Sequence, residues 1–328
     1  MLNRWLLVGK HQVLCELNSF PHTKQLIKFF GVFVDSHLVD AWHKDGVVLL
    51  PEFFTPDEIK PIYQDYQSIY GEAGQGDGSA VDFKVDGAIG AGHAKQFMNI
   101  DVLPYEGSTA MNMISLHPKL IEISKQLLGV DEVHLYQSHT WAKYTGEADY
   151  DQAHHCDFGN HTLTVPSDDA SMRTVNFIIY ISDVSDDLGA LHYVSKDDSD
   201  EILGEGAVIA PSETQMELKE RERSAAAPAG SLLIYGIDAF HRGTNLTRTD
   251  GFRYTMTVSY KAANNPMIDF HVWQFSAERP WAKIFNEATP DQLACLGIPR
   301  PGDSFWTPRT LELTNKRWPE WDMSDYAL

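Results

Sequence analysis

Cysteine is scarce in this sequence, basic residues are fewer than acidic ones, and long apolar runs are absent. The three cysteines, Cys15, Cys156 and Cys295, are widely spaced and form no CxxC pair, which argues against a disulfide framework or a zinc knuckle. This usage fits a reducing compartment, so we expect a cytoplasmic protein. No segment approaches the ~20 consecutive apolar residues that a membrane-spanning helix requires. We therefore expect no membrane partner.

The charge balance narrows the choice of partners further. Lysine and arginine number 26 against 46 aspartate and glutamate residues, a formal net charge of -20. A field of this sign repels phosphate backbones, so we expect no nucleic-acid partner. The charge does not select a substrate, because a local basic pocket can hold an anion inside an acidic protein. A small-molecule substrate is expected, and the sequence does not indicate an oligomeric state.

The chain is expected to form one main domain. Residues 1–40 are interpreted as an N-terminal extension, and 41–328 as a single domain. From about 265 onward, prolines alternate with tryptophans, which predicts a segment that wraps the domain as irregular structure anchored by aromatics. A short helix is expected to begin at Pro290.

Two helices are predicted early in the domain. A short apolar strand, Val47–Leu50, precedes Thr55, which can cap a helix, and Glu58 completes a capping box. Proline at the first helical position supports a helix over Pro56–Tyr70. Residues 118–128, which start with proline and are followed by glycine, predict a second helix.

From residue 133 the pattern changes to short β-rich segments. Their spacing predicts a mainly β fold with flanking helices, an α+β barrel or sandwich. Two charged segments between them, Lys196–Glu201 and Glu213–Arg223, are interpreted as solvated loop or helix surface. The expected strands are 133–143, 174–182, 190–194, 231–237 and 254–260.

A candidate metal site is the most informative feature of the sequence. His155 and Asp157 are two residues apart, and residues at this spacing in a strand project to the same face. His241 closely follows the apolar strand Leu232–Tyr235 and supplies a third ligand. Two histidines and one carboxylate leave three open positions, the arrangement typical of iron(II) oxygenases. A bidentate 2-oxo acid and dioxygen can occupy these positions.

An arginine and a threonine follow the last proposed ligand. Arg253 and Thr255 are two residues apart and share one face of an expected strand. A guanidinium matches a carboxylate in shape, and a nearby hydroxyl completes the grip on a dicarboxylic cosubstrate such as 2-oxoglutarate. The alternative for Arg253 is a surface ion pair.

Taken together, these pieces resemble the phytanoyl-CoA dioxygenase family, within the 2-oxoglutarate oxygenase superfamily. The resemblance spans about residues 40 to 262. It implies a double-stranded β-helix, also described as a jelly-roll or cupin-like barrel, with iron(II), dioxygen and the decarboxylation of 2-oxoglutarate to succinate. The matching segments are Trp42–Val48, Tyr136–Ser138, Lys143, His155–Phe158, Asp187–Leu191, His241–Asn245 and Arg253.

The ectoine-hydroxylase branch of that family suggests two further cosubstrate residues. By this likeness Gln137 contacts 2-oxoglutarate, and Asn176 occupies a position where a small polar residue does the same. There are departures from the branch at Gly159, Trp141 and Val194–Asp197. These departures argue against ectoine as the substrate and leave the metal site intact.

Several neighbouring residues admit a simpler interpretation. His154 is on the opposite strand face from Asp157, and Cys156 between the ligands is expected to be a bystander. His161 and His192 are interpreted as structural histidines. Lys143 has two open interpretations, contact with an anionic cosubstrate or with a carboxylate at the barrel rim.

Hydroxylation is the reaction favoured by the sequence. Halogenases of the superfamily lack the carboxylate ligand, whereas Asp157 is present here. Two other classes stay open: a metal-dependent, cupin-type enzyme that does not use dioxygen, and a catalytically silent barrel acting as a binding module. The substrate is not indicated, because the segments expected to line its site are variable in the family. They are residues 71–92, residues 160–171 and the aromatic C-terminal segment.

Overall fold

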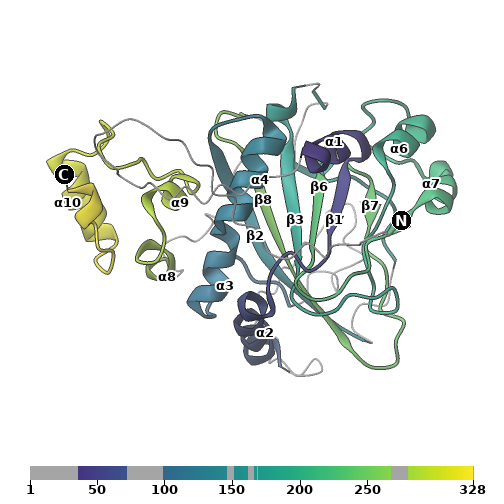
Figure 1. Ribbon diagram of the computed structural model, residues 1–328, viewed down its shortest axis with the longest axis horizontal. Helices are drawn as coiled ribbons and strands as arrows, with labels where there is room; N and C mark the ends of the chain where they lie inside the picture. The colour runs from purple at the N-terminus through teal and green to yellow at the C-terminus, as the bar shows by residue number, and fades with distance from the viewer. Residues whose placement is uncertain are drawn as a thin grey trace, which may run out of the picture. The chain divides into compact units, whose positions relative to one another are not determined.

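The computed structural model describes residues 36–71, 99–145, 151–161, 166–167, 169–266 and 280–327 (Figure 1). Most of the predicted extension and of the glycine-rich segment 71–92 lies outside the described residues. The strands are β1 (Val47–Leu50), β2 (Val133–Tyr144), β3 (Thr174–Tyr180), β4 (His192–Tyr193), β5 (Arg223–Ser224), β6 (Leu232–Gly236), β7 (His241–Arg242) and β8 (Phe252–Ala262). The helices are α1 (Ser36–Asp45), α2 (Pro56–Tyr70), α3 (Thr109–Met113), α4 (Pro118–Leu128), α5 (Phe158–His161), α6 (Lys196–Leu203), α7 (Gln215–Arg221), α8 (Ala282–Phe285), α9 (Pro290–Ala294) and α10 (Pro308–Arg317).

The strands form two antiparallel sheets. The larger has the order β1-β6-β3-β8-β2, and the smaller has the order β5-β4-β7. All six predicted strands are present, as β1, β2, β3, β4, β6 and β8, and the ends of some differ by a few residues. The mainly β fold with flanking helices is therefore confirmed.

The two faces of the large sheet differ in chemistry. Along β8, Tyr254, Met256 and Val258 are buried in the main apolar core, together with the helices. Side chains alternate between faces, so Arg253 and Thr255 point to the opposite side. One face of this sheet thus builds the core, and the other presents polar side chains.

Helices pack on the apolar face. The predicted capping box at the start of α2 is present, with the Thr55 hydroxyl and the Glu58 carboxylate each bound to the other's backbone amide. Helix α4 packs against β2, β3 and β8 (Figure 1). The Tyr66 hydroxyl of α2 donates to the Thr255 carbonyl at 2.7 Å, which ties that helix to the centre of the sheet.

The segment after residue 280 differs from its prediction. It contains α8, α9 and α10, so the expectation of irregular structure was wrong, although the helix at Pro290 is confirmed. The reason is local: Thr307 caps α10 with Pro308 at the first helical position, so prolines start helices here. The Cys295 carbonyl accepts from the Leu135 amide at 2.8 Å, so this segment covers the edge strand β2.

Helices α6 and α7 lie beside the small sheet (Figure 1). The charged segment Lys196–Glu201 lies in α6, and most of Glu213–Arg223 lies in α7, so helix was the correct one of the two predicted alternatives. The solvated interpretation was wrong for Glu222 at the end of the second segment, because its side chain is only 11% exposed. Across the described ranges, no helix combines the length and the apolar character that crossing a membrane requires.

Candidate metal centre

Two histidines face each other where β7 meets the segment 151–157. His155 and His241 form a pair of backbone hydrogen bonds of 3.0 and 2.8 Å, and their ring centroids lie 4.7 Å apart. Their Nδ1 atoms lie 2.9 Å from the Ala153 carbonyl and 3.0 Å from the Ala239 carbonyl. An Nδ1–H donated to a carbonyl fixes the tautomer and leaves Nε2 as the metal-binding atom.

Asp157 completes the cluster from the turn before α5. The donor atoms of Asp157, His155 and His241 all lie within 4.8 Å of one another. Burial raises the pKa of Asp157, but His241, the other nearby histidines and a hydrogen bond from Tyr235 together hold it below its usual value. The Tyr235 hydroxyl donates to Oδ2 at 3.3 Å. The carboxylate is therefore held ionised and ready to bind a cation.

This donor set fits iron(II) chemistry. Two imidazoles and one carboxylate on one side of a cation leave the remaining positions to other ligands. The three predicted residues are brought together, but one reason given for it was wrong. His155 belongs to an isolated bridge and Asp157 to a turn, so the two are not neighbours along a regular strand. Their common direction comes from the turn that leads into α5.

The residues around the cluster have structural partners. Cys156 is buried in an apolar cluster with Phe158 and Phe240, and burial raises the pKa of its thiol to about 11. His154 points away from the cluster, as predicted, and its Nε2 lies 3.1 Å from the Glu222 carboxylate. His192 also contacts Glu222, at 2.9 Å, which supports its structural interpretation.

Another predicted histidine lies beside the cluster. His161, at the end of α5, has its ring centroid 5.9 Å from that of Tyr136, and the Tyr136 hydroxyl lies 3.4 Å from its Nδ1. Its charge also contributes to lowering the pKa of Asp157. His161 therefore has a structural partner while remaining close to the candidate metal ligands.

A row of polar residues crosses the large sheet beside the cluster. Tyr235 pairs with Asn176, Asn176 with Ser259, and Ser259 with Gln137, on four successive strands. The Gln137 amide donates to the Ser259 hydroxyl at 2.9 Å. Because Tyr235 also contacts Asp157, this row connects two predicted cosubstrate residues with the candidate metal ligands.

Asn176 offers a donor that the protein itself does not use. Its Oδ1 accepts from the Tyr136 hydroxyl at 2.9 Å, and the side chain is fully buried. Its Nδ2 is buried without a hydrogen-bond partner among the described residues. A buried amide of this kind is costly unless a ligand accepts its hydrogen. This orphan donor fits an oxygen-rich cosubstrate beside the metal.

The remaining predicted cosubstrate residues lie at the other end of the same face. Arg253 is buried, and Lys143 is its direct partner across β2 and β8. Burial, followed by the charge of Arg253, lowers the pKa of Lys143 to about 7. Thr255 is buried two residues further along. Arg253 is thus not a surface ion-pair residue, and the half-buried Lys143 lies opposite it on the neighbouring strand.

A tight glycine brings Arg253 close to the strand that carries His241. Gly189 has a φ of 75°, and a Cβ there would lie 2.6 Å from the Thr244 carbonyl and 3.1 Å from the Arg253 Nη1. Thr244 follows β7, which starts at His241. The guanidinium therefore lies next to the segment that leads from the metal cluster.

The fold and this cluster define a metal-binding protein of the double-stranded β-helix class. The chain belongs to the phytanoyl-CoA dioxygenase family, whose model matches residues 42–254. The resemblance inferred from the sequence motifs is thereby confirmed. A comparison with curated proteins finds no match.

Solved structures agree with the predicted fold. EctD from S. alaskensis, solved with 2-oxoglutarate and 5-hydroxyectoine, is 16% identical over 76% of this chain and 82% of that chain, with a TM-score of 0.54. The epimerase SnoN, in complex with Fe3+, alpha ketoglutarate and nogalamycin RO, is 17% identical over 70% and 83%, with a TM-score of 0.52. The carbocyclase SnoK from nogalamycin biosynthesis is 16% identical over 75% and 91%, with a TM-score of 0.51. The predicted cosubstrate, 2-oxoglutarate (alpha ketoglutarate), is named for all three of these structures, and Fe3+ is named for SnoN.

Two features of the site were not found from the sequence. The sequence pattern predicts Tyr235 only as part of a strand and Glu222 only as part of a charged surface segment. Glu222 directly follows α7, and Leu218, four residues earlier within the helix, is fully buried. That spacing was a signal, although it does not identify what Glu222 contacts.

Proposed function

We propose that the protein is an iron(II)- and 2-oxoglutarate-dependent dioxygenase that hydroxylates a small or medium-sized metabolite and releases succinate and CO2. The observation that carries this proposal is the cluster of His155, Asp157 and His241, with donor atoms within 4.8 Å. Membership of the phytanoyl-CoA dioxygenase family supports it.

The metal would be held by Nε2 of the two histidines and by the Asp157 carboxylate. Iron(II), when bound, supplies the activation of dioxygen that drives oxidative decarboxylation of 2-oxoglutarate and oxidation of the substrate. The carbonyls of Ala153 and Ala239 orient the two imidazoles, and the Tyr235 hydroxyl orients the carboxylate.

The cosubstrate would be held by the polar face of the large sheet. Arg253 offers a guanidinium fork to the distal carboxylate, with Lys143 as a second cation and Thr255 as a hydroxyl partner. Asn176 offers its unused amide hydrogen near the metal, and Gln137 lies in the same row. The two ends of a dicarboxylic 2-oxo acid would thus have different partners.

Hydroxylation is favoured over other outcomes because the carboxylate ligand is retained in Asp157. The solved relatives include an epimerase and a carbocyclase, so the oxidised product must be identified directly. A hydroxylated product is 16 mass units heavier than its substrate, an estimate that follows from adding one oxygen atom to the substrate. An epimerised product would have unchanged mass.

The first test is an anaerobic titration of the iron(II)-loaded protein with 2-oxoglutarate, followed by visible absorption. We expect a weak charge-transfer band in the wild type, which Asp157→Ala and Arg253→Ala lose or weaken strongly. Arg248→Ala is the matched control, because this arginine is half exposed and pairs with Asp187 at 3.7 Å. It should leave the band unchanged.

The same titration can overturn the proposal. If folded, iron-loaded wild-type protein gives no band, the assignment to 2-oxoglutarate fails, and a cupin-type enzyme or a binding module takes its place. If the band forms, succinate release can be used to screen metabolites, and mass spectrometry of each product distinguishes hydroxylation from other oxidations.

A further inference from the structure

The paired segments that carry the two histidines have a second face. His155 and His241 are opposite each other in the pairing, so the adjacent residues His154 and Arg242 are opposite each other on the reverse side. On the next strand, β4, His192 pairs with Arg242. Three neighbouring side chains therefore lie together behind the metal cluster.

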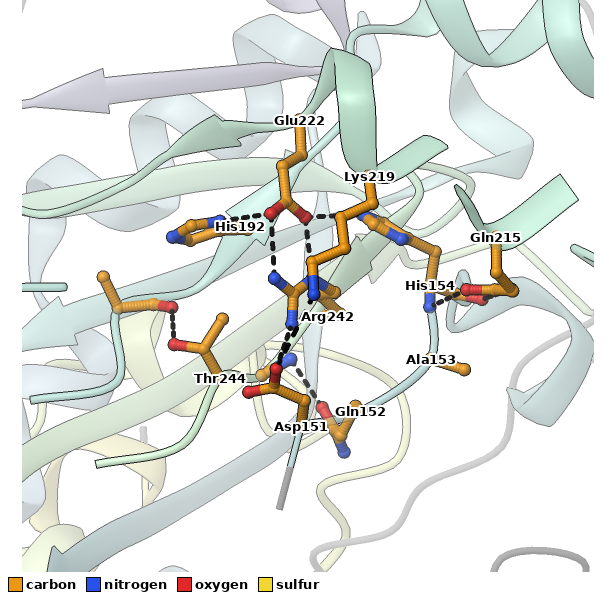
Figure 2. A network of polar contacts seen from close by, with 12 residues as sticks. Asp151, Gln152, Ala153, His154, His192, Gln215, Lys219, Glu222, Arg242 and Thr244 are labelled. Atoms are coloured by element: carbon orange, nitrogen blue, oxygen red, sulfur yellow. Dashed lines mark hydrogen bonds and ion pairs between the residues drawn. The ribbon is translucent and has the colours of Figure 1, made fainter. Parts of the chain in front are cut away.

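One carboxylate joins these three side chains. Figure 2 shows His154, His192 and Arg242 converging on Glu222. Arg242 donates to both carboxylate oxygens, at 2.7 and 2.8 Å. Nε2 of His154 lies 3.1 Å from one oxygen, and Nδ1 of His192 lies 2.9 Å from the other. Glu222 thus contacts one residue from each of the three segments.

The group is largely withdrawn from solvent. Side-chain exposure is 1% for His154, 6% for Arg242 and 11% for Glu222. Burial raises the pKa of Glu222, but the hydrogen bonds from Arg242 and the close approach of His192 outweigh it and hold the pKa at about 2. An ionised carboxylate bound by a guanidinium fork at low exposure is a strong and directional contact.

Helix α7 fixes the position of Glu222 over these segments. The Gln215 side chain at its start accepts from the His154 amide at 2.7 Å and donates to the His154 carbonyl at 3.1 Å. Asp151 adds a second carboxylate to Arg242, at 3.3 Å (Figure 2). Helix α7 and the glutamate that follows it therefore hold the ligand-bearing segments at several points.

The regular pairing around the two histidines is short. His155 belongs to an isolated bridge, and β7 has two residues, His241 and Arg242. Removing the Glu222 charge would leave the Arg242 cation buried with a weaker partner, which is strongly unfavourable. Relaxation of that strain would change the separation of His155 and His241.

We propose that Glu222 is a positioning residue for the metal centre. It sets the spacing of His155 and His241 from behind, through His154 and Arg242, without touching the metal. This inference rests on the proposed function, because it assumes that the two histidines bind a metal. It predicts that metal affinity depends on a carboxylate outside the ligand set.

The test compares cobalt(II) binding by metal-free wild type, Glu222→Gln and Glu201→Gln, using calorimetry and the visible ligand-field spectrum. Glu201→Gln is the matched control, because it also removes a carboxylate bound to arginine, at 2.6 Å, but is 68% exposed. We expect Glu222→Gln to bind cobalt(II) about 10- to 100-fold more weakly, the range seen when partners of metal ligands are removed. Its ligand-field bands should shift, and Glu201→Gln should match the wild type.

The outcomes separate the two proposals. If the wild type binds neither cobalt(II) nor iron(II), the proposed function fails. If the wild type binds metal and Glu222→Gln binds it equally well, with the same spectrum, the positioning role is overturned. The same conclusion follows if Glu222→Gln lowers only the melting temperature of the metal-free protein.

A second variant tests the same proposal if Glu222→Gln does not fold. If circular dichroism shows that Glu222→Gln is unfolded, Arg242→Lys keeps the charge but loses the bidentate fork. We expect this variant to be folded and to bind cobalt(II) more weakly than the wild type. Wild-type affinity and spectrum in folded Arg242→Lys would overturn the proposal.

Discussion

Lys143 and Arg253 are direct cross-strand partners on β2 and β8, and both point to the polar face of the large sheet. Like charges directly opposite each other are destabilising in a sheet. Here burial and the neighbouring guanidinium lower the pKa of Lys143 to about 7, which reduces that repulsion. A dicarboxylate bound between the two side chains would place negative charge beside both of them.

Removing the lysine charge should weaken cosubstrate binding. We expect Lys143→Met to raise the dissociation constant for 2-oxoglutarate about tenfold, because a hydrogen bond to a charged group contributes about 1.5–3 kcal/mol. Arg253→Lys should have a larger effect, since it loses the fork. Calorimetry on the metal-loaded protein measures both. Unchanged affinity in Lys143→Met would favour the alternative that this lysine contacts a rim carboxylate.

The same lysine should make stability depend on pH. The folded protein releases the Lys143 proton near pH 7, whereas an unfolded chain keeps it to about 10.4. Between these values the unfolded state binds more protons, so the free energy of unfolding rises with pH in this window. Below pH 7 both states hold the proton, and this contribution becomes constant. Urea denaturation from pH 6.5 to 9.5 should show a stabilising effect of Lys143→Met that shrinks as pH rises. A constant difference would contradict the prediction.

Asn176 should matter more for binding than for folding. Its unused Nδ2 gains a partner only when a ligand accepts the hydrogen. We expect Asn176→Ala to weaken 2-oxoglutarate binding by about 5- to 20-fold, a typical value for losing one hydrogen bond with an uncharged donor. Gln137→Ala is the comparison, because the Gln137 amide already donates to Ser259. An equal loss in both variants would show that the orphan donor has no special role.

A side chain at position 189 should disturb both the local backbone and the position of Arg253. Alanine there combines a positive φ with a Cβ 2.6 Å from the Thr244 carbonyl. Gly206→Ala is a matched control, since Gly206 has the same φ of 75° and no atom within 4 Å. We expect Gly189→Ala to lower the free energy of unfolding by about 1–3 kcal/mol more than the control, from overpacking. It should also weaken 2-oxoglutarate binding, as measured by calorimetry.

Much of the strand pattern could be predicted because burial imposes a period on the sequence. Strands β2, β3, β6 and β8 are long or strongly apolar, and each was expected. Strands β5 and β7 were not, because two residues carry no period and, unlike β4, neither lies in a segment that was predicted as a strand. The candidate ligands could be recognised by residue type and order, although Asp157 reaches the cluster from a turn.

The support around the cluster could not be predicted, because it depends on contacts between distant segments. Glu222 meets Arg242 at a sequence separation of 20 and His154 at a larger one. A glutamate at the end of a charged helix has the same local signature whether it is solvated or buried. Asn176 was expected at the site by resemblance, but its unused donor follows only from packing.

Because side chains alternate between the two faces along β8, substitutions on this strand should have two different effects. Tyr254, Met256 and Val258 lie in the core, while Arg253 and Thr255 point to the opposite face, where we propose that the cosubstrate binds. A saturation mutagenesis scan of β8 that measures both protein abundance and turnover should therefore give different results at even-numbered and odd-numbered positions. Even-numbered positions should lose protein, and odd-numbered positions should leave a well-folded but inactive chain. Evolution of a new substrate preference would have little freedom on this strand and would depend on the loops that surround it.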